Sequence, residues 1–381
     1  MKIRPSRRDF FRGATALSLA SLLPVSARAD DQTIRIMGVE TAALDKWDEY
    51  SAETGLKVEF TGINSDVGIF RQEVVANGDG DNIDIFLMDG GIQEELGPGG
   101  YFLPIDGTRV PGWSDMPETL RNSPLLTDKK GTLYGIPAVL NADSFAYYPE
   151  LTPDNGKPLS FSLLFESDVT KGKVGLEDNW LTTLPMAATF LKVAKNMAIG
   201  NPSAMTADET KKVVDYLIER KKAGQFRALW TSFDESVDML GNKEVIVSNV
   251  WEPAVKQLQK AGKNVKYAYT VEGYNKWLIG AYVATQVKSR GTEDLVYKAL
   301  GGLLGGAYSA RIAVLRGYAT GRPELGLQYA KAHNYPADEI ADIEANIAKV
   351  NKKFTAPLFW QNAAPPELTV IEAEWDRFRQ A

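Results

Sequence analysis

Residues 33–61, TIRIMGVETAALDKWDEYSAETGLKVEFT, place a helical pattern between two short apolar strand patterns. We expect the strands at Thr33–Met37 and Leu56–Thr61 and the helix at Leu44–Thr54, with Gly55 as the residue that ends it. Residues 83–88 (IDIFLM) are typical of a third, buried strand. Strands and helices that alternate at this pitch predict βαβ units, a mostly parallel sheet and therefore an α/β fold.

The rest of the chain continues this alternation and then becomes mostly helical. A capping box at Thr206–Glu209 predicts the start of an amphipathic helix. Two extended stretches, beginning at Tyr134 and at Glu272, are typical of strands that cross between lobes. We therefore expect two α/β lobes, with one large α/β domain and a helical tail as the alternative. The first lobe is expected at residues 30–138 and 272–318, and the second at residues 139–271 and 319–381.

Composition excludes much of enzyme chemistry. The 381 residues are 44% hydrophobic and 24% charged, with no Cys and a single His, His333. Disulfides, thiolate nucleophiles and Cys-ligated metals are therefore absent, and a His-ligated metal or a Ser–His pair is hard to build. Phosphate-loop, nucleophile-elbow and zinc-helix motifs are also missing, and the glycines of residues 301–306 indicate close helix packing. We expect no catalytic residue, no metal and no cofactor.

Residues 1–29 have the pattern of an export signal. Arg7 and Arg8 precede Asp-Phe-Phe, an apolar run follows, and Ala27-Arg28-Ala29 ends the segment. The apolar run is too short to span a bilayer, and the pair of arginines resembles the twin-arginine signal that exports folded proteins. We expect cleavage after Ala29 and, without a lipobox Cys, a free protein in the periplasm, with the twin-arginine export machinery as a partner.

Charge favours a cationic ligand. The first 29 residues hold six of the 43 basic and one of the 49 acidic residues, so their removal changes the net charge from −6 to −11. An acidic protein repels phosphate backbones, so nucleic acid is not an expected partner.

Aromatic residues at the ends of predicted elements indicate a binding cleft. Trp180 follows an acidic stretch, Trp251 closes a strand and precedes Glu252, and Trp277 and Tyr318 follow turns. Residues just past the carboxyl ends of strands face the ligand crevice of an α/β sheet. An aromatic ring beside a carboxylate is what recognition of an amine requires.

Several motifs also resemble one known family across essentially the whole mature chain. They are the signal, the opening that ends in ETGLKV (53–58), DIF (84–86), GTLYGIP (131–137), VEGxxxW (271–277) and GY (317–318). The chain is similar to the periplasmic solute-binding proteins of ABC importers, in their spermidine/putrescine-binding branch. The resemblance implies a type II fold, a ligand cleft between two lobes that close by hinge motion, delivery to a cognate permease in the inner membrane, and a monomer.

The resemblance also implies roles for single residues. Trp251 and Trp277 match the two tryptophans that sandwich an alkyl-amine chain in that branch, Tyr318 matches a cleft tyrosine, and Asp89 and Asp178 fall in segments that contact ligand. Three features of that branch are replaced in this chain. Val39 and Ala42 stand where the branch has a pair of aromatic residues, Ile279 stands where it has a carboxylate that binds an amine, and Gly91 stands where it has a further aromatic residue.

The predicted solute site combines negative charge with aromatic walls. Arg316 opens a second possibility, a zwitterionic or anionic cargo such as an amino acid, a betaine or an aminophosphonate, because a guanidinium pairs with a carboxylate or phosphonate. Two rival interpretations are an exported α/β hydrolase or transferase and an interaction module without a small ligand. The predicted site residues are Glu40, Asp89, Asp143, Asp178, Trp180, Trp251, Glu252, Trp277, Arg316 and Tyr318.

Overall fold

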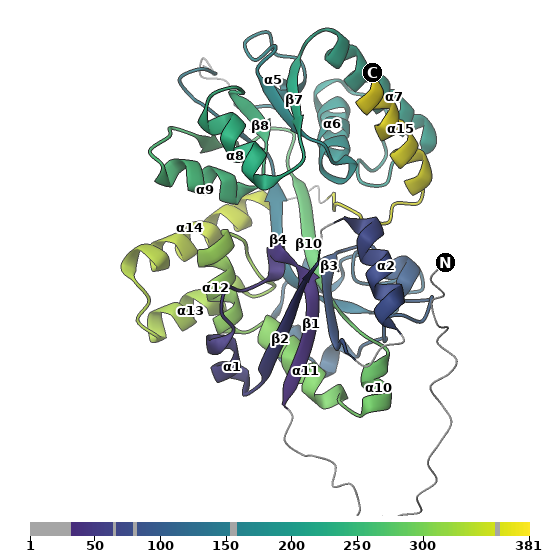
Figure 1. Ribbon diagram of the computed structural model, residues 1–381, viewed down its shortest axis with the longest axis vertical. Coiled ribbons are helices and arrows are strands. Elements are labelled where there is room, and N and C mark those ends of the chain that lie inside the picture. Colours follow the sequence, from purple (N-terminus) through teal and green to yellow (C-terminus); the bar gives the residue numbers. More distant parts are fainter. Residues whose placement is uncertain (1–31, 64–65, 79–81, 153–157, 355–358) are drawn as a thin grey trace, which may run out of the picture. The chain divides into compact units, whose positions relative to one another are not determined.

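The computed structural model describes residues 32–63, 66–78, 82–152, 158–354 and 359–381. The predicted signal at residues 1–29, with Arg7 and Arg8, lies outside these ranges. Residues 33–381 form one compact unit (Figure 1). Within the described ranges, none of the helices combines the length and the apolar character needed to cross a membrane.

Two five-stranded sheets form the frame of this unit (Figure 1). In the first sheet the strand order is β2-β1-β3-β10-β4, and in the second it is β7-β6-β8-β5-β9. The strands of the first sheet are β1 (Thr33–Val39), β2 (Lys57–Ile63), β3 (Ile85–Asp89), β4 (Gly135–Asp143) and β10 (Asn275–Val283). Those of the second are β5 (Phe145–Tyr147), β6 (Val174–Glu177), β7 (Phe226–Trp230), β8 (Val247–Asn249) and β9 (Lys266–Tyr267).

Both sheets are mixed, so the prediction of a mostly parallel sheet is wrong. β1 pairs in parallel with β2 and β3, but β10 runs antiparallel to β3 and β4. In the second sheet β6 is parallel to β7 and β8, whereas β5 is antiparallel to β8 and β9. The reason lies in the crossings between the sheets. The chain leaves the first sheet through β4 into β5 and returns through β9 into β10, so the outgoing and returning strands run in opposite directions.

Helices cover each sheet and bury a separate apolar core beside it. The helices that precede or follow strands of the first sheet are η1 (Glu40–Ala42), α1 (Asp48–Thr54), α2 (Val67–Gly78), α3 (Gln93–Leu96), η2 (Gly107–Arg109), η3 (Trp113–Asp115), α4 (Glu118–Arg121), α10 (Gln286–Arg290), α11 (Glu293–Leu303) and α12 (Gly306–Arg316). Those between strands of the second sheet are α5 (Ser162–Phe165), α6 (Trp180–Ala194), α7 (Ala207–Lys222), α8 (Phe233–Gly241) and α9 (Glu252–Lys260).

The last three helices are divided between the two sheets. α13 (Pro323–Ala332) and α14 (Ala337–Lys353) contact α12, and α14 also contacts β4, whereas α15 (Leu368–Gln380) contacts α7 and α6. α13 and α14 belong to the stretch 319–381 that was expected in the second lobe, and they contact α12 and β4, an element of the first sheet. Their apolar faces pack on α12, which precedes them directly, and the chain crosses to the second sheet only after α14.

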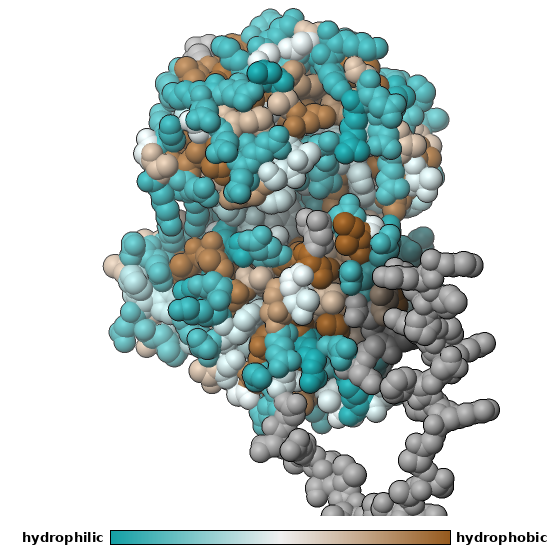
Figure 2. All heavy atoms as spheres, viewed as in Figure 1, coloured by the Kyte–Doolittle hydropathy of each residue, from teal (hydrophilic) through white to brown (hydrophobic). Residues whose placement is uncertain are grey.

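Several local predictions are confirmed. Gly55 ends α1 in the left-handed conformation, with φ of 66°, and Thr206 and Glu209 form the capping box of α7. The glycines at the start of α12 serve close packing, because a Cβ atom on Gly306 would lie 2.7 Å from Cβ of Tyr329. Figure 2 shows one face of the unit, where hydrophilic residues cover most of the surface and hydrophobic residues gather near the middle.

Candidate functional site

Carboxylates stand at the ends of three strands. Asp89 and Asp143 are the last residues of β3 and β4, and Glu177 is the last residue of β6. β10 runs in the opposite direction, so its early residue Trp277 lies at the same edge of the first sheet. Trp251 follows β8 by two residues. Strand ends and one strand start therefore bring these five residues together.

These residues surround a small cavity, which we call the inner cavity. Its volume is about 70 Å³. Residues of both sheets line it, and Trp277 and Tyr318 meet edge to face on one side with ring centroids 5.0 Å apart. The lining consists of Thr41, Asp89, Asp143, Glu177, Asn179, Leu181, Thr182, Trp251, Trp277, Ile279, Tyr318 and Gln361.

The three carboxylates of the inner cavity resist ionisation. Burial raises the pKa of Asp89 to about 7, and the nearby charge of Asp143 adds to the rise. Burial likewise raises the pKa of Asp143 to about 7, partly offset by a hydrogen bond from Trp277 and by the charge of Lys353. The pKa of Glu177 rises to about 8, again chiefly by burial, with Asp143 contributing repulsion. The cavity therefore concentrates negative charge that lacks enough positive charge beside it.

Two of these carboxylates also orient the aromatic walls. The indole N–H of Trp277 donates to Asp143, and that of Trp251 donates to Glu177. Thr182 Oγ1 donates to Glu177 Oε2 at 2.8 Å. Oδ1 of Asp143 is buried and has no hydrogen-bond partner among the residues that the structure describes. A buried acceptor without a donor indicates a place for a ligand that brings one.

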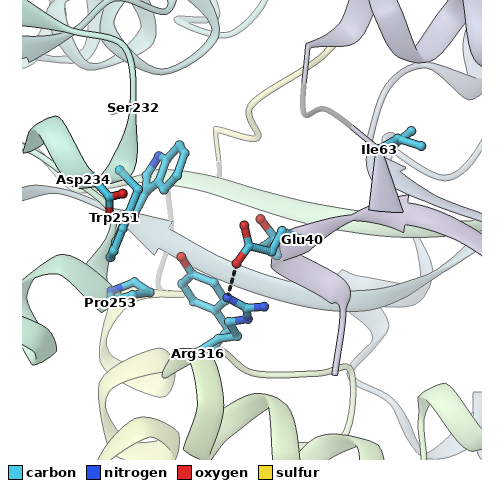
Figure 3. Close-up of a pocket in the computed structure, with 10 residues that line it drawn as sticks. Glu40, Ile63, Ser232, Asp234, Trp251, Pro253 and Arg316 are labelled. Atoms are coloured by element: carbon cyan, nitrogen blue, oxygen red, sulfur yellow. Dashed lines mark hydrogen bonds and ion pairs between the residues drawn. The ribbon is translucent and has the colours of Figure 1, made fainter. Parts of the chain in front are cut away.

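A larger, outer cavity of about 540 Å³ adjoins the inner one. The two share Thr41, Trp251 and Tyr318 as lining residues. Figure 3 shows Glu40 and Arg316 joined by an ion pair, with Nη1 of Arg316 2.9 Å from Oε1 of Glu40, while Trp251, Pro253 and Asp234 lie together on other elements of the lining. Ile63, Ser232 and Phe233 complete the lining of the outer cavity.

Asp178 and Trp180 lie beside a third cavity, which adjoins the inner one through Glu177, Asn179, Leu181 and Trp251. They line this cavity, of about 340 Å³, together with residues of α15. The carboxylate of Asp178 accepts a hydrogen bond of 3.1 Å from Trp375 Nε1 and pairs with Arg379 Nε at 2.9 Å. This carboxylate therefore holds α15 in place, and Asp178 and Trp180 line neither the inner nor the outer cavity.

Glu252 also has partners within the protein. Its Oε2 atom lies 2.8 Å from Nζ of Lys349 and 3.6 Å from Nζ of Lys353, and Nδ2 of Asn141 donates to it at 3.4 Å. Burial alone would raise the pKa of Glu252, but the charges of the two lysines hold it below its ordinary value. Glu252 lines neither the inner nor the outer cavity, so the structure gives it an internal ion cluster instead of the predicted ligand contact.

The sequence prediction includes Asp178 and misses Glu177, its neighbour. Successive side chains of a strand point to opposite sides, so the choice between adjacent acids depends on the exact end of β6. The hydrogen bond of Thr183 Oγ1 to the backbone oxygen of Glu177 and the donation from Thr182 place Glu177 at the start of α6, facing the cavity. The two adjacent acidic residues Glu177 and Asp178 are visible in the sequence, but only the exact end of β6 shows which of them faces the cavity.

The positions at which the chain departs from the polyamine-binding branch also have structural explanations. Ile279 pairs with Asp89 across β10 and β3 and contributes an apolar wall to the inner cavity. Gly91 has φ of 109°, and a Cβ atom there would overlap the side chain of Asn362, so an aromatic residue does not fit. In the part of the chain that the structure describes, no group of three or more His, Asp or Glu residues is arranged to hold a metal ion.

A comparison with known protein families gives a match. A family model described as "Bacterial extracellular solute-binding protein" matches residues 47–300, which is more than half of the chain. No curated protein sequence matches.

Solved structures share the fold at low sequence identity. The spermidine/putrescine ABC transporter substrate-binding protein PotD of Streptococcus pneumoniae, in complex with calcium and HEPES, matches with a TM-score of 0.65 and 15% identity, over 92% of this chain and 99% of that one. The periplasmic binding protein MotA of A. tumefaciens B6, in complex with glucopine, matches with a TM-score of 0.60 and 15% identity, over 91% of this chain and 99% of that one. A structure described as "Atu4243-GABA receptor" matches with a TM-score of 0.58 and 16% identity, over 91% of this chain and 96% of that one. The expected α/β type II fold is therefore confirmed.

Proposed function

Because the chain belongs to the bacterial extracellular solute-binding protein family, we propose that it is the substrate-binding component of an ABC importer and that its solute carries an ammonium group. Family membership also agrees with the sequence prediction of a binding protein in place of an enzyme. The proposal keeps the amine part of the predicted polyamine-like cargo and is independent of the rest of the ligand.

One observation carries the proposal, namely the imbalance of charge around the inner cavity. Asp89, Asp143 and Glu177 line the cavity, and the cluster of Glu252 with Lys349 and Lys353 lies next to Asp143. If all six groups are ionised, two negative charges remain uncompensated. A desolvated charge needs partners, so an ammonium group that enters the cavity replaces the missing positive charge.

The aromatic walls complete the recognition of such a group. Trp251, Trp277 and Tyr318 offer ring faces and edges around the cavity, and a cation over an aromatic face is attracted by the ring quadrupole. An ammonium also supplies the donor that Oδ1 of Asp143 lacks. The site then releases the cation by hydrating it again when the carboxylates separate.

The mechanism of transport follows from where the carboxylates stand. Asp143 is the last residue of β4, at the crossing into β5, and Glu177 belongs to the second sheet. An ammonium bound between them ties the two sheets together, which favours a closed arrangement by hinge motion at the crossings. We propose that the closed form delivers the solute to a permease in the inner membrane, and that the protein acts as a periplasmic monomer exported through the twin-arginine signal.

The test is calorimetry on refolded, ligand-stripped protein with n-butylamine, putrescine and spermidine, and with n-butyrate as a control that carries no amine. We expect at least one amine to bind and butyrate to be silent. Asp143→Asn is expected to weaken amine binding at least tenfold, whereas Asp168→Asn, which removes an exposed carboxylate, leaves it unchanged. Equal affinity in the Asp143 variant, or no binding of any amine, would overturn the proposal.

A further inference from the structure

We infer that the solute is an elongated zwitterion, with its ammonium in the inner cavity and an anionic group on Arg316 in the outer cavity. The inference rests on the proposed function, because it takes the ammonium site as given. It adds the chemical class of the other end of the solute and assigns its recognition to one side chain.

The first step concerns size. The inner cavity, at about 70 Å³, has room for little more than two water molecules, each of which takes about 30 Å³ in the liquid. An ammonium with one or two carbons fills it. The remainder of any longer solute enters an adjoining cavity, and the outer one, at about 540 Å³, offers more room than the third, at about 340 Å³.

The second step concerns Arg316, the last residue of α12. Its side chain is 22% exposed, and its Nη1 atom binds Glu40. Its Nε atom is buried and has no hydrogen-bond partner among the residues that the structure describes. A guanidinium presents parallel N–H groups that match the two oxygens of a carboxylate, so Arg316, which lines the outer cavity and has an unused donor at Nε, can pair with an anionic ligand.

The third step weighs the acidic residues of the outer cavity against this assignment. Glu40 and Asp234 both line the cavity and would attract a second ammonium (Figure 3). However, the side chain of Glu40 is 84% exposed and already paired with Arg316, and Asp234 is exposed, so both are solvated without a ligand. The buried Nε donor is the group that gains most from a ligand, because it is shielded from water and unpaired. We therefore assign an anion to this end of the site.

The experiment compares three probes with the same carbon skeleton: the n-alkylamine, the α,ω-diamine and the ω-amino acid, each with chains of three to six carbons. Calorimetry on ligand-stripped protein is expected to show that the best ω-amino acid binds at least tenfold more tightly than the matching alkylamine and diamine. Arg316→Met is expected to remove this preference and to leave the affinity for the alkylamine within threefold.

Arg322→Met is the matched control. Arg322 is equally exposed, at 22%, and pairs with Asp115 at 2.8 Å, but it lines neither the inner nor the outer cavity. This variant is expected to keep the preference for the ω-amino acid. Glu40→Gln provides a test that keeps the Arg316 side chain but removes the charge of its ion-pair partner. It removes the competing carboxylate and is expected to strengthen binding of the ω-amino acid by threefold or more.

The outcomes separate this inference from the proposed function. A diamine that binds as tightly as the ω-amino acid, or a preference for the ω-amino acid that survives Arg316→Met, overturns the zwitterion and leaves the ammonium site intact. If none of the amine-bearing probes binds, the proposed function itself fails.

Discussion

The inner cavity and the neighbouring Glu252 cluster bury the same chemical groups with opposite results. Asp143 and Glu177 line the cavity and are buried, and burial raises the pKa of each. Glu252 is buried to a similar degree, yet its pKa lies below the ordinary value. Burial alone therefore does not distinguish a ligand-binding carboxylate from a structural one.

The difference comes from the partners. Lys349 and Lys353 reach from α14 to Glu252, and each also donates to one backbone oxygen, with Lys349 Nζ 2.7 Å from Gly317 O and Lys353 Nζ 2.9 Å from Ala142 O. That cluster is satisfied by the protein itself. The carboxylates of the inner cavity face one another instead. A buried charge that the chain leaves uncompensated is thus the better indication of a binding site.

The largest expected effect comes from removing the charge of Glu252. Glu252→Gln leaves Lys349 and Lys353 buried without their carboxylate, and breaking one side of a buried ion pair costs about 3–5 kcal/mol. We expect the free energy of unfolding, measured by urea denaturation at pH 7, to fall by that amount. A loss below about 1 kcal/mol, the range typical of an exposed ion pair, would show that the cluster is not the structural counterpart of the cavity.

The second prediction concerns pH in the ligand-free protein. Between pH 5 and 8 the unfolded chain has its Asp and Glu residues ionised, whereas folded Asp89 and Asp143 lose their protons near pH 7 and Glu177 near pH 8. The folded state therefore binds more protons, and its free energy of unfolding falls as pH rises, by at least about 2 kcal/mol over this range.

Two features make the pH test specific. The pKa of Glu252 lies below its ordinary value, so its favourable contribution is lost only in acid, below this range. The penalty from burying Lys349, whose pKa falls to about 8, is constant below that pH. Urea denaturation at pH 5, 6, 7 and 8 measures the slope. A stability that is flat or rises with pH would contradict the claim that the cavity's carboxylates are uncompensated.

The third prediction is a gain in the free energy of unfolding, where the first is a loss. Asp89→Asn removes a carboxylate that Asp143 repels, so the ligand-free protein at pH 8 should gain about 1–2 kcal/mol. The same change should weaken binding of the best amine probe at least tenfold. Urea denaturation and calorimetry on one preparation give both numbers. Destabilisation comparable to that of Glu252→Gln would place Asp89 with the structural carboxylates.

Sequence reasoning predicted the class of fold because it depends on local patterns. Apolar runs at residues 33–37 and 83–88, the glycine stop at Gly55 and the capping box at Thr206 are all short-range signals, and each has its counterpart in the structure. The direction of β10 was not predictable in this way, because it depends on which sheet the chain is returning to.

The site could be predicted in part for the same reason. Asp89 and Asp143 end strands, Trp251 follows one and Trp277 lies near the start of one, and all four line the inner cavity. The charge of Glu252 is compensated by lysines of α14, which lie far along the chain, and no sequence pattern near Glu252 predicts this pairing. The position of an acidic residue at a strand end does not show whether a distant lysine pairs with it. Such long-range ion pairs decide which acidic residue is available to a ligand.

The smallest expected effect isolates one hydrogen bond in the cavity. Trp277→Phe keeps an aromatic wall but removes the indole N–H that donates to Asp143, so the pKa of Asp143 should rise further. Loss of a hydrogen bond to a carboxylate costs about 1–2 kcal/mol, so binding of the best amine probe at pH 7 should weaken by about tenfold, with the midpoint of its pH dependence shifted upward.

Trp375→Phe is the matched control for this variant. The indole of Trp375 also donates to a carboxylate, that of Asp178, at 3.1 Å, but outside the inner cavity. Both variants lose one indole N–H from a buried ring, so both should lose some stability, and only Trp277→Phe should move the pH midpoint of amine binding. Equal midpoints in the two variants would mean that Asp143 is not the carboxylate whose protonation governs binding, and the contrast between the cavity and the Glu252 cluster would then rest on Asp89 and Glu177 alone.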